Sequence, residues 1–402
     1  MSQSLFAAVQ LAPRDPILGL TEAFNTDTRT NKVNLGVGVY YDDNGKLPLL
    51  AAVREAEKTR MEAAPARGYL PIEGFGAYNQ AVQHLLFGKD SPLLAAGRVA
   101  TFEALGGTGG LKIGADFLKR LAPSAEVWIS DPSWENHRAL FEGAGFKVNA
   151  YPYYDSVSHG VNFEGMLAAM NAMPAGAIVV LHACCHNPTG VDLGIDQWKQ
   201  VLEAVRARGL VAFLDMAYQG FGDGIEEDAA ALRLFADSGL PFFVSSSFSK
   251  SFSLYGERVG ALSIVTLDRD ETTRVISQVK RVIRTNYSNP PTHGAAIVAA
   301  VLSTPELRKL WEQELAGMRE RIRQMRVQLV EKLKARGVKQ DFSFVTTQRG
   351  MFSYSGLTSA QVDRLREEFG IYAIGTGRIC LAALNSKNID AVADAIAQVV
   401  AE

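Results

Sequence analysis

Residues 177–218, "AIVVLHACCHNPTGVDLGIDQWKQVLEAVRARGLVAFLDMAY", indicate the fold class most clearly. It begins with a short apolar run (177–185) and ends with another (210–218), and both have the length of buried strands. Between them, residues 195–209 form an amphipathic pattern that ends in basic residues and a glycine, which predicts a helix. A strand, a helix and a second strand in this order indicate parallel neighbours in one sheet.

The same alternation continues on both sides of this stretch. Further apolar runs of strand length occur at 125–132, 145–154, 242–248 and 261–267. We therefore predict an α/β fold whose larger part is a mostly parallel sheet covered by helices. In such sheets ligands bind at the carboxyl ends of the strands, so the polar residues that follow these runs are candidates for a site.

The pattern changes near Thr304. One long amphipathic helix is predicted from 305 to 337, and shorter strand and helix signals follow it to the C-terminus. The stretch "KVNLGVGVYYDDNGK" (32–46) carries a strand signal of its own. We predict a large domain (48–304) inserted between the two pieces of a smaller α/β domain (14–47 and 305–402).

Composition limits the kinds of protein this can be. The chain has 402 residues, 47% of them hydrophobic, and a formal net charge of −2, so neither sign accumulates as it would for a nucleic-acid or membrane-surface partner. No apolar run approaches the length of a membrane span, and the N-terminus lacks the pattern of a signal peptide. Three cysteines, two of them adjacent, cannot form a disulfide framework, and free thiols predict a cytoplasmic protein.

The glycine-rich stretch "GGTGGLKIGADFL" (106–118) opens a helical pattern. Free N–H groups at a helix N-terminus suit a phosphate, although a plain tight turn explains the same residues. Lys112 stands where a dinucleotide-binding motif needs its last glycine, and the spacing of a nucleoside-triphosphate loop is absent from the sequence. Neither of those two cofactor classes is supported.

The stretch "CCHNPTG" (184–190) has the composition of a strand-to-helix turn. His182 and His186 lie near the two cysteines and suggest zinc, but adjacent cysteines do not give the usual ligand spacing. We therefore expect no metal site.

Asp215 ends an apolar run, where an unpaired carboxylate would be costly. It needs a cationic or N–H partner, and Tyr218 follows three residues later. A buried aspartate bonded only to backbone is an equally good explanation of this segment alone.

Lys250 lies in "SSSFSKSFSLYGERVG" (245–260), directly after an apolar run and between Phe248 and Phe252. Partial burial lowers the pKa of a lysine, and a lysine that is neutral part of the time forms Schiff bases with aldehydes. Ser247, Ser249 and Arg258 offer the hydroxyls and the positive charge that a phosphate needs. A lysine for a Schiff base, phosphate ligands and a buried carboxylate are together what pyridoxal phosphate requires.

The chain also resembles a known family of enzymes. The motifs "HNPTG" (186–190), "DMAYQGFG" (215–222), "SFSKSFSLYGERVG" (247–260), "NYSNPPTHGA" (286–295) and "GRICLAALN" (377–385) resemble those of the fold-type I (class I) aminotransferases, in the subgroup that acts on aspartate and aromatic amino acids. The resemblance covers essentially the whole chain. It implies the aspartate aminotransferase fold, with a mostly parallel seven-stranded sheet in the large domain, and pyridoxal 5'-phosphate as the cofactor.

The resemblance also implies roles around the cofactor. Lys250 would be the Schiff-base lysine and the carrier of the proton, and Asp215 would pair with the ring nitrogen, supported by Asn136 and His137. Tyr218 and Asn187 would bond the ring oxygen, and Trp134 would stack on the ring. The phosphate would be held by Gly107, Thr108, Ser247 and Arg258, with Tyr69 from a second subunit. Gly106 stands where many relatives have serine, which removes one hydroxyl contact.

For the substrate, the resemblance implies two arginines. Arg378 would grip the α-carboxylate, next to Asn187 and Trp134, and Arg284 would enter from the neighbouring subunit to meet a side-chain carboxylate. Val37 and Gly38 would lie over the substrate. Residues 1–13 would then be an arm packed on the other subunit of a homodimer. An isolated arginine is more commonly part of a surface salt bridge, but these two lie inside the motif set.

The resemblance implies a transaminase that follows ping-pong kinetics with 2-oxoglutarate as the acceptor. The runs at 130–141, 182–190, 225–233 and 348–372 look closest to the bacterial tyrosine (aromatic) enzymes, so we expect aromatic amino acids to be favoured over aspartate. The alternatives are an aspartate aminotransferase with little aromatic activity, a β-decarboxylase or β-eliminase, and a regulatory protein that binds the cofactor without turnover.

Overall fold

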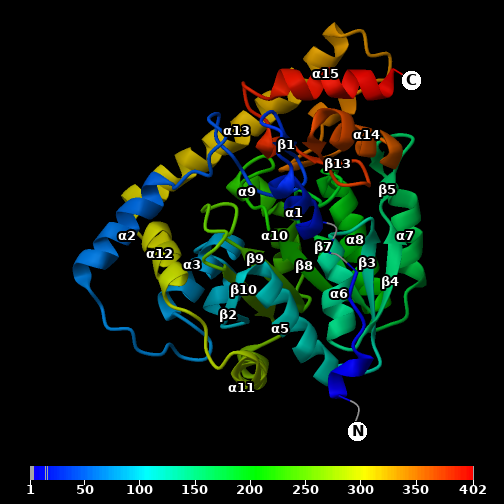
Figure 1. The fold of residues 1–402 in the computed structure, drawn as a ribbon. Coiled ribbons are helices and arrows are strands. Elements are labelled where there is room, and N and C mark those ends of the chain that lie inside the picture. Colours follow the sequence, from blue (N-terminus) through cyan, green and yellow to red (C-terminus); the bar gives the residue numbers. More distant parts are fainter. Residues whose placement is uncertain (1–3, 14, 16, 402) are drawn as a thin grey trace.

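The computed structural model describes residues 4–13, 15 and 17–401. At its centre lies a seven-stranded sheet (Figure 1). In spatial order its strands are β2 (Val99–Leu105), β10 (Val259–Val265), β9 (Phe242–Ser247), β8 (Val211–Met216), β7 (Ile178–His182), β3 (Glu126–Asp131) and β4 (Lys147–Pro152). Only β10 runs against its neighbours, so the predicted, mostly parallel seven-stranded sheet is confirmed.

Alternate residues of the central strands enter two separate hydrophobic clusters. In β7, Ile178 and Val180 belong to one cluster, and Val179 and Leu181 belong to the other. Because successive side chains of a strand point to opposite faces, each cluster lies on one face of the sheet. Both faces are therefore buried, which explains why these strands read as continuous apolar runs.

Helices cover the two faces. The face of Ile178 packs against α5 (Gly106–Leu121), α6 (Glu135–Gly143) and α11 (Arg269–Asn286). The opposite face packs against α3 (Gly76–Phe87), α7 (Phe163–Ala172), α8 (Ile195–Arg208), α10 (Ala230–Asp237) and α12 (His293–Ser303). The remaining elements of this part are α2 (Ala51–Ala63), α4 (Pro92–Ala95), α9 (Ile225–Asp228), β5 (Tyr154–Asp155) and β6 (Gly160–Val161).

The two ends of the chain meet above this sheet. Strand β1 (Val33–Asn34) pairs in parallel with β12 (Ile371–Tyr372), and β11 (Phe352–Tyr354) pairs antiparallel with β13 (Arg378–Cys380). The long predicted helix is α13 (Pro305–Ala335), which runs from α12 to α15 along one side of the molecule (Figure 1). The other elements here are α1 (Leu18–Thr26), η2 (Ser343–Thr346), α14 (Ser359–Phe369), η3 (Leu381–Ala383) and α15 (Ile389–Val400). The short turn η1 (Leu5–Ala8) lies apart from them, at the opposite end of the molecule (Figure 1).

The division into an arm (1–13), a small domain (14–47 and 305–402) and a large domain (48–304) stays a prediction. Residues 1–3, 14 and 402, at or near its boundaries, lie outside the described residues. None of the helices in the described part of the chain is both long enough and apolar enough to cross a membrane.

Candidate functional site

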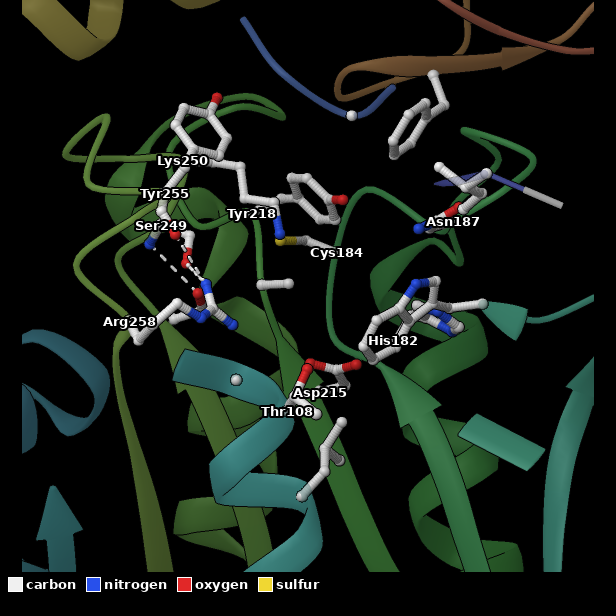
Figure 2. A pocket seen from close by; sticks show the side chains of 18 of the residues that line it. Thr108, His182, Cys184, Asn187, Asp215, Tyr218, Ser249, Lys250, Tyr255 and Arg258 are labelled. Atoms are coloured by element: carbon white, nitrogen blue, oxygen red, sulfur yellow. Dashed lines mark hydrogen bonds between the residues drawn. The ribbon is translucent and has the colours of Figure 1, made fainter. Parts of the chain in front are cut away.

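A cavity of about 230 Å³ opens at the carboxyl ends of the parallel strands (Figure 2). His182 is the last residue of β7, Asp215 lies near the end of β8, and Ser247 ends β9. This edge of the sheet is where the sequence predicted a ligand. Among the predicted site residues, the cavity is lined by Gly38, Gly107, Thr108, Trp134, Asn187, Asp215, Tyr218, Ser247, Lys250, Arg258 and Arg378.

Lys250 follows β9 and places its ammonium group inside this cavity, with Nζ 4.9 Å from the centre of the Tyr218 ring. Burial lowers the pKa of Lys250 to about 8, the negative charge of Asp215 partly offsets this effect, and the positive charge of Arg258 adds to it. Part of the Lys250 population is therefore neutral near neutral pH, as a nucleophile or proton acceptor must be.

Asp215 has the partner that its burial requires. Its Oδ2 lies 2.8 Å from Nε2 of His137, in the first turn of α6, and Nδ1 of His137 lies 2.9 Å from the hydroxyl of Ser133. Burial alone would raise the pKa of Asp215, but the hydrogen bond from His137 and the nearby positive charge of Lys250 help to hold it below its usual value. Asp215 is thus kept ionised, with His137 in the predicted supporting position; Asn136 precedes it in α6.

A group of hydrogen-bond donors suited to a phosphate, which we call the phosphate cradle, lies where α5 begins. Gly107 and Thr108 lie in the first turn of this sixteen-residue helix. The N–H groups of a first turn have no partner within the helix. Arg258 lies on the same side of the cavity and donates from Nη1 to the hydroxyl of Ser249, 3.3 Å away (Figure 2). A helix N-terminus, a guanidinium and hydroxyls together suit a dianionic phosphate.

The structure explains the glycine at position 106. Its φ is +69°, and a Cβ placed there would lie 2.6 Å from Nη2 of Arg258. A serine at this position would therefore displace the Arg258 side chain or strain the backbone. The missing hydroxyl contact thus accompanies a close approach of Arg258 to the helix.

Arg378, at the start of β13, is held from two sides. Its Nη1 donates to Oδ1 of Asn187 (3.1 Å), its Nη2 donates to the carbonyl oxygen of Gly36 (2.7 Å), and the guanidinium lies 4.3 Å from the centre of the Phe352 ring. The side chain is only 1% exposed, yet Nε has no hydrogen-bond partner. An unsatisfied charged donor at the wall of a cavity is suited to an anionic ligand such as a carboxylate.

Three predicted residues do not line this cavity. Tyr69 is 96% exposed, and Arg284 is exposed on α11, where it donates to the hydroxyl of Ser288. Val37 is half-buried beside Gly38. Tyr69 and Arg284 were predicted to serve a second subunit, and that role stays a prediction.

Sequence reasoning missed several residues that line the cavity. His182 was considered only as a zinc ligand, yet both of its ring nitrogens are buried without a partner. Burial, followed by the nearby charge of His137, lowers the pKa of His182 to about 3, so its ring is neutral. Phe352 and Tyr255 lay inside the quoted motifs but carried no separate signal. The other missed residues are Ile17, Leu111, Cys184 and Ala217, whereas Ser249, a candidate phosphate ligand from the sequence, does line the cavity.

Among the residues that the structure describes, two groups of side chains have donor atoms close enough together to be considered for a metal. They are His137, His182 and Asp215, and Cys184, Cys185 and Asp228. In the first group Asp215 is already bonded to His137, and Asp228 accepts from the backbone N–H groups of Gly220 and Gly222. These bonds satisfy the carboxylates from within the protein, and the absence of a metal stays a prediction.

The residues fit pyridoxal phosphate, the cofactor that the resemblance implies. The phosphate cradle at Thr108 and Arg258 lines the cavity together with the ionised Asp215, and Lys250 enters the cavity from the side opposite Asp215 (Figure 2). The buried, partnerless nitrogens of Arg378 and His182 are polar groups that need a ligand or water. The charges of the site complement those of a phosphorylated aldehyde with a cationic ring and of a carboxylate bound beside it.

Comparison with known proteins agrees with this geometry. The family model for aminotransferase class I and II matches residues 30–396. The chain is 71% identical to an aspartate aminotransferase of Pseudomonas aeruginosa, covering 98% of this chain and 100% of that protein, and 53% identical to an aromatic-amino-acid aminotransferase of Escherichia coli, with the same coverage. It superposes with a TM-score of 0.97 on the crystal structure of an aromatic-amino-acid aminotransferase from Burkholderia pseudomallei covalently bound to pyridoxal phosphate, at 72% identity over 99% of this chain and 100% of that one.

Proposed function

Since this chain belongs to the class I and II aminotransferases and is a pyridoxal-phosphate-dependent transaminase, we propose that it accepts amino groups from both aromatic amino acids and aspartate, with 2-oxoglutarate as the acceptor and the aromatic amino acids favoured. The names of its relatives support both kinds of substrate. A protein 71% identical is named an aspartate aminotransferase, and one 72% identical is named an aromatic-amino-acid aminotransferase.

One observation carries this proposal. A single cavity contains a lysine whose pKa is lowered to about 8, an ionised Asp215 and an arginine with a free buried donor. Pyridoxal phosphate, when bound, supplies an aldehyde that takes the amino group and a ring that accepts electrons from the α-carbon. The chain's own residues then have to bind the amino acid, orient it and move its proton.

Each of these tasks has a residue in the proposal. Arg378 binds the α-carboxylate through Nε and the free edge of its guanidinium, and Asn187 fixes the orientation of that guanidinium. Lys250, in its neutral form, takes the proton from the α-carbon and returns one in the second half-reaction. Asp215, held ionised by His137, keeps a negative charge at the floor of the cavity, where it favours a cationic ring nitrogen.

The remaining predicted residues complete the site. Tyr218 and Asn187 bond the ring oxygen of the cofactor and Trp134 stacks on its ring. Gly107, Thr108, Ser247 and Arg258 hold its phosphate. Val37 and Gly38 lie over the substrate. All of these except Val37 line the cavity.

We propose that two subunits share their sites. Tyr69 reaches the partner's phosphate cradle, and Arg284 meets the side-chain carboxylate of aspartate in the partner's cavity. Support comes from their exposure, since neither belongs to the cavity of its own chain. Arg284 turns away for an aromatic side chain, for which Ile17 and Phe352 offer apolar surface. We place this homodimer in the cytoplasm because all three cysteines are free.

Initial rates test the proposal directly. Phenylalanine and aspartate, each with 2-oxoglutarate, should both yield their keto acids, and double-reciprocal plots should give parallel lines, because both half-reactions use one site. We expect the larger kcat/KM for phenylalanine. Keto acid from aspartate alone would instead support the second candidate, an aspartate aminotransferase, which the 71% identical relative favours. Alanine and carbon dioxide from aspartate would instead point to β-decarboxylation, and ammonia released without amino transfer to 2-oxoglutarate would point to elimination.

A further inference from the structure

Arg326 is a buried cation on α13, outside the cavity described above. It is 2% exposed, and its pKa is lowered to about 10 by burial, so it stays charged at neutral pH. Its four hydrogen bonds go to carbonyl oxygens and one hydroxyl of a single segment, residues 345–353. Nη1 donates to the carbonyl of Val345 (3.1 Å) and the hydroxyl of Ser353 (3.2 Å), and Nη2 donates to the carbonyls of Gly350 (2.7 Å) and Phe352 (2.7 Å).

Burying a guanidinium against neutral acceptors is expensive, because none of its four hydrogen-bond partners carries a full negative charge to offset its loss of hydration. The arrangement does have one special property. The planar guanidinium donates in two directions at once and so fixes both ends of the segment relative to α13. A lysine has a single point of charge and cannot reach all four acceptors.

The clamped segment supports Arg378 from two sides. The first support is Phe352, whose ring lies under the Arg378 guanidinium at 4.3 Å. The second is the loop that carries Asn187, since Arg349 donates its N–H to the carbonyl of Gly190 (2.7 Å). These two segments of the chain approach each other closely. A Cβ on Gly190, whose φ is +71°, would lie 2.6 Å from the carbonyl oxygen of Phe352.

We propose that Arg326 is a positioning residue for substrate recognition, which fixes the segment 345–353 so that Phe352 and Asn187 hold the Arg378 guanidinium with its free edge toward the carboxylate. This inference rests on the proposed function, because it takes Arg378 as the carboxylate-binding residue. Arg326 itself touches neither the substrate nor the cofactor. It acts through the orientation of Arg378.

The test measures carboxylate affinity separately from activity. The probe is 3-phenylpropanoate, a carboxylate without an amino group, titrated into the holoenzyme and followed by calorimetry. In Arg326→Lys we expect its Kd to rise about tenfold, the range for a charged hydrogen bond that loses its geometry. The Kd of pyridoxal phosphate should change less than about twofold, because its ligands rest on α5, β8 and β9.

The matched control is Arg308→Lys on the same helix. Arg308 is half-buried, and its ion pair is with Glu312, one turn further along α13. It should leave both affinities unchanged. If Arg326→Lys does not fold, Ser353→Ala removes one acceptor of the clamp and should raise the probe Kd by about threefold. In either variant the KM for amino acids should rise more than kcat falls.

The outcomes separate the inference from its premise. An unchanged probe Kd in both Arg326→Lys and Ser353→Ala overturns the positioning role. Equal weakening of probe and cofactor also overturns it, because that result describes general loosening of the fold. Failure of the unmodified holoenzyme to bind 3-phenylpropanoate, or of Arg378→Ala to weaken its binding, contradicts the proposed role of Arg378 and removes the premise.

Discussion

At the scale of single residues, Lys250 has its positive charge in a buried position, where a charge lowers the free energy of unfolding. Its pKa is about 8 in the folded protein against 10.5 for an ordinary lysine. Because the pKa of Lys250 is lower in the folded protein than in the unfolded chain, the charge on Lys250 lowers the free energy of unfolding. This destabilisation is complete below pH 8 and disappears as the pH rises to about 10.5.

This sign gives a prediction for the cofactor-free protein. Lys250→Met should raise the free energy of unfolding by as much as about 3 kcal/mol at pH 7, the equivalent of the pKa shift. The gain should shrink steadily between pH 8 and pH 10.5. Denaturant unfolding of parent and variant at several pH values measures the difference, and a gain that does not depend on pH would contradict the assignment. The variant should also lose transamination.

Arg284 gives the sharpest prediction about specificity. Arg284→Ala should lower kcat/KM for aspartate by about 100-fold or more, the effect of losing a charge-assisted partner in a shielded site. The loss for phenylalanine should stay within a few-fold. Arg281→Ala, an exposed arginine of the same helix, is the control. Equal losses for the two substrates would refute the division of labour between Arg284 and Arg378.

Residue identities in the site could be predicted in part. The burial of Asp215 implied a partner, but the partner is His137, which is 78 positions away, and only the folded chain brings the two together. His182 and Phe352 were missed because an isolated histidine or phenylalanine in an apolar run has the same appearance whether it faces a core or a cavity. The family motifs supplied the residues that local chemistry could not.

At the scale of elements, helix α2 begins without a cap of its own. Its first N–H groups, those of Ala51 and Ala52, donate to the carboxylate of Glu314 on α13 (2.6 and 3.1 Å). A negative charge at a helix N-terminus is favourable both as a cap and through the helix dipole.

Glu314→Ala should therefore lower the free energy of unfolding by about 1–2 kcal/mol. The matched control is Glu320→Ala on the same helix, whose carboxylate bonds only the side chain of Gln324 at the surface and should cost a few tenths at most. Denaturant titration of both variants decides the matter. Equal effects would show that Glu314 contributes no more than an ordinary surface charge.

Apolar runs predicted six strands of the large sheet, and all six form. The run at 99–105 was missed because Glu103 interrupts it; this residue is nonetheless 2% exposed, and burial raises its pKa to about 7. The reversed direction of β10 was also beyond the sequence, since a strand buried on both faces has the same composition in either direction. The long helix 305–335 was clear because its amphipathic period extends over eight turns.

At the scale of the whole molecule, the pairing of β1 with β12 joins the N-terminal and C-terminal parts of the chain, as the sequence pattern suggested. The domain boundaries at 47 and 304 remain our proposal. The homodimer also remains our proposal. Apolar residues of the N-terminal segment, such as Leu5, Phe6 and Leu11, support it, because they are exposed as those of an arm that packs on a second subunit would be.

Shared sites predict complementation between two inactive variants. Lys250→Ala and Arg284→Ala, unfolded together and refolded, should form hybrids in which one site has both intact residues. Random pairing makes half of the dimers hybrid, so aspartate turnover should reach about a quarter of the unmodified value. Each variant refolded alone is the control. A mixture no more active than its components would mean that Arg284 does not serve the partner's site.

A single half-reaction decides whether the enzyme is a transaminase for both aromatic amino acids and aspartate. Purified holoenzyme is titrated with phenylalanine and, separately, with aspartate, without any keto acid, while the visible absorbance of the bound cofactor is followed. We predict that both amino acids convert the cofactor to its aminated form, with phenylalanine saturating at the lower concentration. Conversion by aspartate alone would contradict the proposed substrate range, and no conversion by either would contradict the substrate assignment altogether.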